Sequence, residues 1–167
     1  MLNNNTLTNS DFMTSAFPAE YSNALSGVFD LKLKTGNNEK HEYMAQVGIT
    51  GLELGAEGPF SKKHNSSFTF NYRYSTFGLL DKIVDFNISG IPKFQDICFK
   101  LNFPSKKGTL SIFGLVGTSD LEMLANQADS SDFAFEGTRE NITFGSDMAA
   151  VAIAYTRFIN NTTWTKI

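Results

Sequence analysis

The sequence predicts an all-β protein, an antiparallel up-and-down meander of six or seven strands. Residues 66–77 read SSFTFNYRYSTF and alternate aromatic with polar side chains, as a strand with two unlike faces does. Similar alternation recurs along the chain, and the stretches between are rich in Gly, Asn, Ser and Thr, which favour turns. Helix-forming residues are not concentrated anywhere.

The alternation in residues 66–77 is compatible with two kinds of sheet. One face carries Phe68, Phe70, Tyr72 and Tyr74, and the opposite face includes Asn71 and Arg73. A soluble protein would bury the aromatic face against a second layer. A transmembrane barrel would turn that face toward lipid and keep the polar face in the lumen. Alternation alone leaves both arrangements open.

The first part of the chain predicts two strands and a helical turn. Phe29, Leu31 and Leu33 alternate with polar residues and predict one short strand, and Pro18 suits the start of a helical turn. Residues 42–50 predict a second strand. The apolar residues occupy odd positions before Thr50-Gly51 and even positions after it, which indicates either a hairpin or a bulge there. We expect the hairpin, because a single strand over residues 42–60 would be unusually long.

Turn signals and further alternation continue the meander. Gly58-Pro59 is expected to end the strand before residue 60, and apolar faces recur in residues 97–103, 110–116 and 151–155. Residues 163–167 begin a further strand. The short polar turns SKKHN, PSKKG and INNT fall at one end of the meander, and the long segments 78–92 and 119–141 fall at the other. Short turns at one end and long loops at the other are typical of outer-membrane barrels. If Thr50-Gly51 were a bulge, the two kinds of connection would still be separated, but the ends would be reversed relative to the start of the chain.

Composition excludes several classes of function. The formal net charge is -3 and the basic residues are scattered, so no nucleic-acid surface is expected. Cys98 is the only cysteine, so no internal disulfide is possible. No stretch of about 18 apolar residues predicts a transmembrane helix, although a barrel strand needs only about ten alternating residues. The start MLNNNTLTNSD does not have the pattern of a signal peptide.

No catalytic, cofactor or metal site is expected. Glu53 and Glu57 lie on the strand face opposite the apolar residues Leu52 and Leu54, and they are interpreted as lumen-facing or solvent-facing charges. His41 and His64 have no partner at ligand spacing. The glycine-rich run GITGLELGAEGPF is not a phosphate-binding loop, and the Gly-x-Ser-x-Gly pattern is absent. We therefore do not expect an enzyme.

Several segments together resemble a known family. Residues 10–12 (SDF), 16–21 (AFPAEY) and 23–31 (NALSGVFDL) are similar to the end of the plug domain in TonB-dependent outer-membrane receptors. The likeness is greatest to the Bacteroidetes-type receptors that carry a carboxypeptidase-regulatory-like domain. Residues 52–63 (LELGAEGPFSKK) look like that group's first barrel hairpin and turn, and NYRYST and FKLNFP continue the likeness. The plug-to-barrel motif comprises Phe17, Pro18, Ala19, Glu20, Tyr21 and Gly27.

The resemblance implies a position, a function and partners. Residues 1–40 would be the C-terminal part of a plug domain, and residues 41–167 the N-terminal strands of an incomplete transmembrane barrel. The chain would be an internal fragment of a receptor that takes up a ligand across the outer membrane with energy from the TonB complex. Phe68, Phe70, Tyr72 and Tyr74 would face outer-membrane lipid, while Asn71 and Arg73 would face the lumen. Ser22 departs from the family, which usually has glycine there.

Two other interpretations remain. The chain could be a small soluble β-sandwich or a lipocalin-like binding module, with the aromatic face as its dry core. A complete eight-stranded outer-membrane barrel is disfavoured, because the first region does not read as a barrel strand and residues 163–167 only begin one.

Overall fold

A computed structural model describes residues 3–14, 17–21, 26–48, 51–76, 91–123, 142–160 and 162–167. Within them, helical structure is limited to three short 3-10 turns, and the remaining regular structure is β. The all-β prediction is therefore confirmed. Ser22 and most of the two expected long loops, residues 78–90 and 124–141, lie outside the described residues.

The N-terminal part forms a small unit of its own. It contains η1 (Asn4–Thr6), β1 (Asp11–Thr14), η2 (Ala19–Tyr21) and β2 (Gly27–Asp30). β1 and β2 pair as an antiparallel two-stranded sheet, and the Phe12 and Phe29 rings stack across it at 4.3 Å. No pattern in residues 11–14 predicted β1. The expected strand through Leu33 ends at Asp30 and continues only as an isolated bridge between Leu7 and Leu33.

The rest of the chain forms one antiparallel sheet of seven strands in sequential order. This confirms the predicted meander, and the sheet is not closed, since β3 and β9 form its two edges. Its strands are β3 (Glu42–Gly48), β4 (Gly51–Ser61), β5 (Ser66–Tyr74), β6 (Ile91–Ser105), β7 (Gly108–Met123), β8 (Ile142–Phe158) and β9 (Trp164–Lys166).

The register decides between the two possibilities at Thr50-Gly51. β3 and β4 pair antiparallel, with Gly48 opposite Gly51, so the hairpin is confirmed and a single long strand is excluded. The expectation that Gly58-Pro59 ends the strand is wrong. β4 continues through both residues, and the irregularity falls later, between Pro59 and Ser61, where the register shifts. The adjacent turn SKKHN contains η3 (Lys62–His64).

Strands β6, β7 and β8 are longer than their apolar patterns predicted, at 15, 16 and 17 residues. β7 extends to Met123, so the first part of the expected acidic loop from Ser119 is strand. The ladder continues past the end of hydrophobic alternation because backbone groups pair whatever side chains they carry. The short connection at Lys106-Lys107 is as expected, with Ser105 opposite Gly108.

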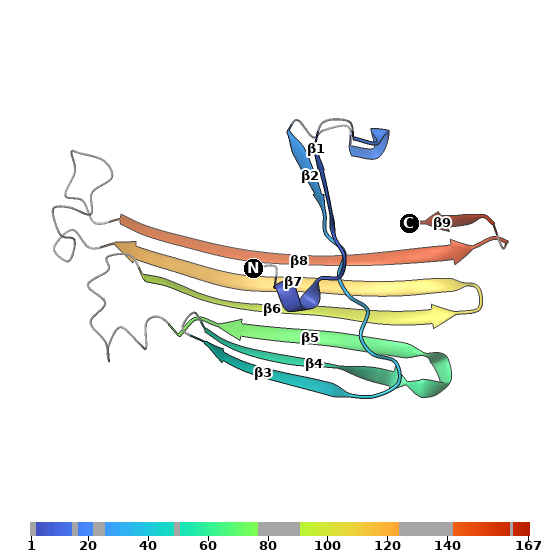
Figure 1. Ribbon diagram of the computed structural model, residues 1–167, viewed down its shortest axis with the longest axis horizontal. Coiled ribbons are helices and arrows are strands. Elements are labelled where there is room, and N and C mark those ends of the chain that lie inside the picture. Colours follow the sequence, from blue (N-terminus) through green and yellow to red (C-terminus); the bar gives the residue numbers. More distant parts are fainter. Residues whose placement is uncertain are drawn as a thin grey trace.

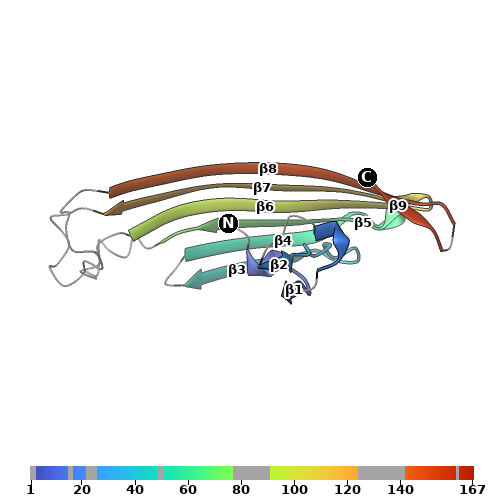
Figure 2. The same ribbon diagram turned by 90° about the horizontal axis from the view of Figure 1, so that it is seen from above.

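The N-terminal unit lies on one side of the seven-stranded sheet (Figures 1 and 2). η1 lies over the middle of the sheet, and the paired strands β1 and β2 project away from it. The chain then crosses the strands toward β3, and Gly36 passes so close to β5 that a β-carbon there would collide with the Phe68 carbonyl. Glycine is therefore required at this crossing.

Candidate functional site

The two faces of the sheet differ in side chains and in burial. One face, called the apolar face, carries Phe68, Phe70, Tyr72 and Tyr74 on β5 together with the residues that the register places beside them. These neighbours are mostly aliphatic or aromatic: Leu54 on β4, Ile97, Phe99 and Leu101 on β6, Ile112 and Val116 on β7, and Val151 and Ile153 on β8.

The apolar face is open to its surroundings. Tyr43 is 78 % exposed, Val151 69 % and Ile153 66 %, and Phe70 and Tyr74 are about two-fifths exposed. The Phe99 ring packs within the face, over Gly114 of the neighbouring strand. Among the described residues, no second layer covers this face. An exposed apolar surface that spans several strands marks a site of contact with lipid or protein.

The opposite face, called the polar face, is covered over β4 to β6, whereas Phe144, Met148 and Ala152 on the same face of β8 are exposed. Ser67, Thr69, Asn71 and Asp96 are each at most 4 % exposed. The described residues include only two fully buried hydrophobic side chains, Cys98 and Leu115, and both occupy positions on this face. Over β4 to β6, burial in the sheet is thus inverted relative to a soluble protein, in which polar residues are mostly exposed.

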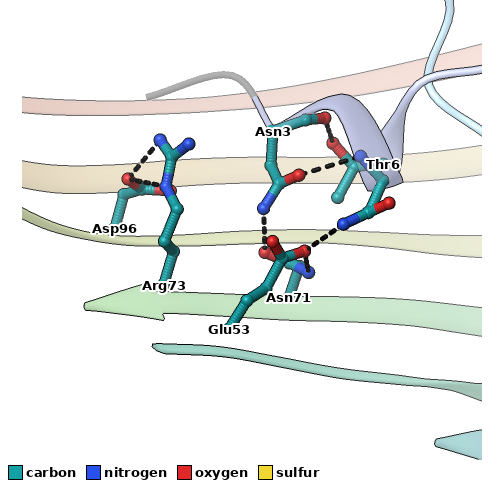
Figure 3. A network of polar contacts seen from close by, with 7 residues as sticks. Asn3, Thr6, Glu53, Asn71, Arg73 and Asp96 are labelled. Atoms are coloured by element: carbon teal, nitrogen blue, oxygen red, sulfur yellow. Dashed lines mark hydrogen bonds and ion pairs between the residues drawn. The ribbon is translucent and has the colours of Figure 1, made fainter. Parts of the chain in front are cut away.

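Residues at the start of the chain cover the polar face through a hydrogen-bond network (Figure 3). Asn3 donates from Nδ2 to Asn71 Oδ1 at 2.8 Å, and Asn71 donates to Glu53 Oε1 at 2.8 Å. Asn5 donates to the same Glu53 oxygen at 2.6 Å. The Thr6 hydroxyl, fully buried, donates to the Asn3 carbonyl. Glu53 therefore joins η1 to β4 and β5 at one point.

A second polar contact lies beside this network. Arg73 on β5 donates from Nε and from a terminal nitrogen to Asp96 Oδ2 on β6, at 3.1 and 2.8 Å. The Asp96 side chain is 2 % exposed, and that of Arg73 is 26 % exposed. The Arg73 guanidinium also lies 5.0 Å from the centre of the Phe94 ring. The other Asp96 oxygen, Oδ1, is buried without a hydrogen-bond partner in the described structure.

The segment that follows β2 is held to the same face. Lys100 on β6 donates to the Leu33 carbonyl at 2.8 Å, and Lys34 pairs with Glu57 on β4 at 2.8 Å. Within the N-terminal unit, a hydrogen bond to Asp11 raises the pKa of Lys32 above its usual value. An open pocket of about 720 Å³ lies between this segment and strands β7 and β8. It is lined by residues such as Leu33, Lys100, Phe113 and Thr156.

The structure separates the residues singled out from the sequence into two groups. Phe68, Phe70, Tyr72 and Tyr74 lie together on the apolar face, and Asn71 and Arg73 lie on the polar face. The plug-to-barrel motif lies apart from both. Ala19, Glu20 and Tyr21 form η2, Phe17 and Tyr21 are half-buried, Pro18 is exposed, and Gly27 begins β2 beside the Phe12 ring.

Sequence reasoning missed the residues that cover the polar face. Asn3, Asn5 and Thr6 belong to a polar start that carries no periodic signal, so nothing distinguished them from a solvated tail. Glu53 and Glu57 were expected to be lumen-facing or solvent-facing, and both are engaged with the N-terminal segment.

The described residues contain no group of His, Cys, Asp and Glu side chains arranged to hold a metal ion. The helical turns in the same residues include none that is long and apolar enough to cross a membrane. Comparison of the chain with protein-family models, with curated proteins and with solved structures finds no match.

Proposed function

We propose that this chain forms part of the wall of an outer-membrane β-barrel, in a receptor that takes up a ligand with energy from TonB. The inverted burial of the sheet carries the proposal. In a membrane barrel the apolar side chains face lipid, and the polar side chains face a lumen. The described sheet has this distribution over β4 to β6, where the apolar face is exposed and the polar side chains of the opposite face are buried.

The spacing of charges along β8 supports a bilayer as the surroundings of the apolar face. Asp147 and Arg157 share the parity of this face and lie ten residues apart, and the positions between them, Ala149, Val151, Ile153 and Tyr155, are uncharged. Ten residues span about 34 Å of strand. A strand tilt of about 40–45° reduces this to about 25 Å, the height of the apolar band in outer-membrane barrels.

The open sheet explains why this part of the wall would not act alone. Backbone groups in lipid must be paired, so only a closed barrel can span. The seven strands leave β3 and β9 as edges. The wall therefore needs further strands to close it, and the described sheet by itself should not transport a ligand.

The receptor part of the proposal rests on the resemblance of residues 10–31 to a plug domain. The position of the N-terminal segment is consistent with it, since this segment lies against the polar face, where the lumen would be. Neighbouring reading frames that encode a plug and further barrel strands would support this assignment. Neighbours of unrelated function would count against it.

Partition of the expressed chain between detergent and water tests the membrane assignment. We expect the chain to enter the detergent phase of a phase-separating detergent and to aggregate when detergent is removed, because the apolar face has no other cover. A monomeric chain that stays soluble without detergent would contradict the proposal and favour the soluble β-sandwich or lipocalin-like module.

A further inference from the structure

The short-turn end of the sheet brings three connections together. These are η3 between β4 and β5, the Lys106-Lys107 turn, and the residues that follow Arg157. The Phe158 amide donates to the Lys107 carbonyl at 3.0 Å, and Arg157 pairs with Gly108 directly after that turn. Phe60, just before η3, stacks on Phe103 at 5.9 Å and so joins the first connection to the second.

This end of the sheet carries a cluster of cations, called the basic rim: Lys63, Lys106, Lys107 and Arg157. All four side chains are exposed. Within the described part of the chain, none of them forms an ion pair with a carboxylate. The charges at the far end of the sheet differ. On the apolar face, that end carries Asp120 and Asp147, and its cation Lys93 lies opposite Asp120.

Aromatic rings lie next to the basic rim on the apolar face. Phe60 is 56 % exposed and packs against Phe68 and Phe103, and Tyr155 occupies the matching row on β8. Such rings favour the boundary between acyl chains and headgroups. Lysine and arginine just outside that boundary can extend their charged ends to the phosphates while their stems stay on apolar surface.

We infer that the basic rim binds the anionic phospholipid headgroups of the leaflet next to the short turns. This inference rests on the proposed membrane function and adds a lipid specificity and an orientation to it. The unpaired cations are complementary to a negatively charged surface, and each of them near such a surface strengthens binding about fivefold. The acidic far end would face the other leaflet.

Co-flotation of the full chain with two kinds of vesicle tests the inference. One kind contains phosphatidylcholine alone, and the other also contains phosphatidylglycerol. We expect tighter binding to the second kind, and the double variant K106Q/K107Q should reduce that preference more than about tenfold. Added salt should reduce it as well, since exposed charges are screened.

The matched control is Lys93→Gln, compared with the single variant Lys107→Gln. Each variant removes one cation from an exposed position, but Lys93 lies at the far end of β6. Only Lys107→Gln should weaken the preference for phosphatidylglycerol. Equal binding to both vesicles, or equal effects of the two variants, would overturn the inference and leave the membrane proposal standing. A chain that floats with neither vesicle would instead contradict the membrane proposal.

Discussion

Arg73 and Asp96 show why the polar face cannot simply be turned toward lipid. The Asp96 carboxylate is almost fully buried and has one cationic partner, which approaches it from the neighbouring strand. A buried charge is stable only when it is paired. The guanidinium also stacks on Phe94, so the same side chain satisfies a charge and packs against a ring.

Removal of this partner should destabilise the sheet strongly. We expect Arg73→Met to lower the free energy of unfolding by about 3 kcal/mol, because it leaves Asp96 buried without a counter-charge. The double variant R73M/D96L should recover most of the loss. Urea unfolding of the chain in detergent micelles measures both effects.

Lys32→Met is the control for this prediction, since it removes the cation of an exposed ion pair with Asp11. Exposed pairs contribute little, so the unfolding midpoint should hardly move. If Arg73→Met behaved like Lys32→Met, the buried pair would not be important for the stability of the sheet.

At the scale of elements, residues 3–8 and 32–34 pair with each other, and polar contacts hold this pair of stretches to the sheet. The Thr8 amide donates to the Lys32 carbonyl, and the Lys34 amide donates to the Thr6 carbonyl. The two stretches therefore pair with each other, and Glu53 and Lys100 anchor the pair to the polar face. Such an attachment can be released without disruption of an apolar core.

Loss of the Glu53 carboxylate should loosen this attachment. Glu53→Leu removes the acceptor of Asn5 and Asn71, and an unsatisfied buried donor costs about 1–3 kcal/mol. We expect amide hydrogen exchange at Thr8 and Lys34 to become about tenfold faster or more. Glu53→Gln retains a carbonyl acceptor and should change exchange less. Unchanged exchange in both variants would show that Glu53 does not hold the segment.

The sequence allowed the strands to be predicted better than their ends. Parity in residues 66–77 assigned Phe70 and Asn71 to opposite faces, and the parity flip at Thr50-Gly51 located a hairpin. Strand length was less accessible, because Thr118 and Asp120 continue the ladder without hydrophobic alternation. Proline was a poor guide at Pro59, since the following irregularity accommodates it.

The contacts that form the candidate site were not predictable from local pattern. Asn3 and Asn71 are far apart in the sequence, and no periodicity connects them. The pairing of β1 with β2 depends on Phe12 and Phe29, which lie in stretches too short to show alternation. Long-range polar contacts of this kind depend on the completed sheet.

At the scale of the whole molecule, the sheet exposes its apolar face and covers the polar face over β4 to β6. The N-terminal unit occupies the polar side, and both edges of the sheet remain open (Figure 2). These features are consistent with one another if lipid contacts the apolar face and further strands continue the wall. They would not favour an isolated soluble domain, whose apolar face would need a second layer.

Site-directed spin labelling along β8 tests this account most directly. Nitroxides at Ile153→Cys and at Ala152→Cys, each in a Cys98→Ser background and in detergent micelles, probe the two faces at adjacent positions. We predict high accessibility to molecular oxygen at position 153, where the label contacts the apolar phase, and high accessibility to a water-soluble nickel complex at position 152. Reversed accessibilities, or a label at position 153 shielded from both reagents, would contradict a lipid-facing sheet.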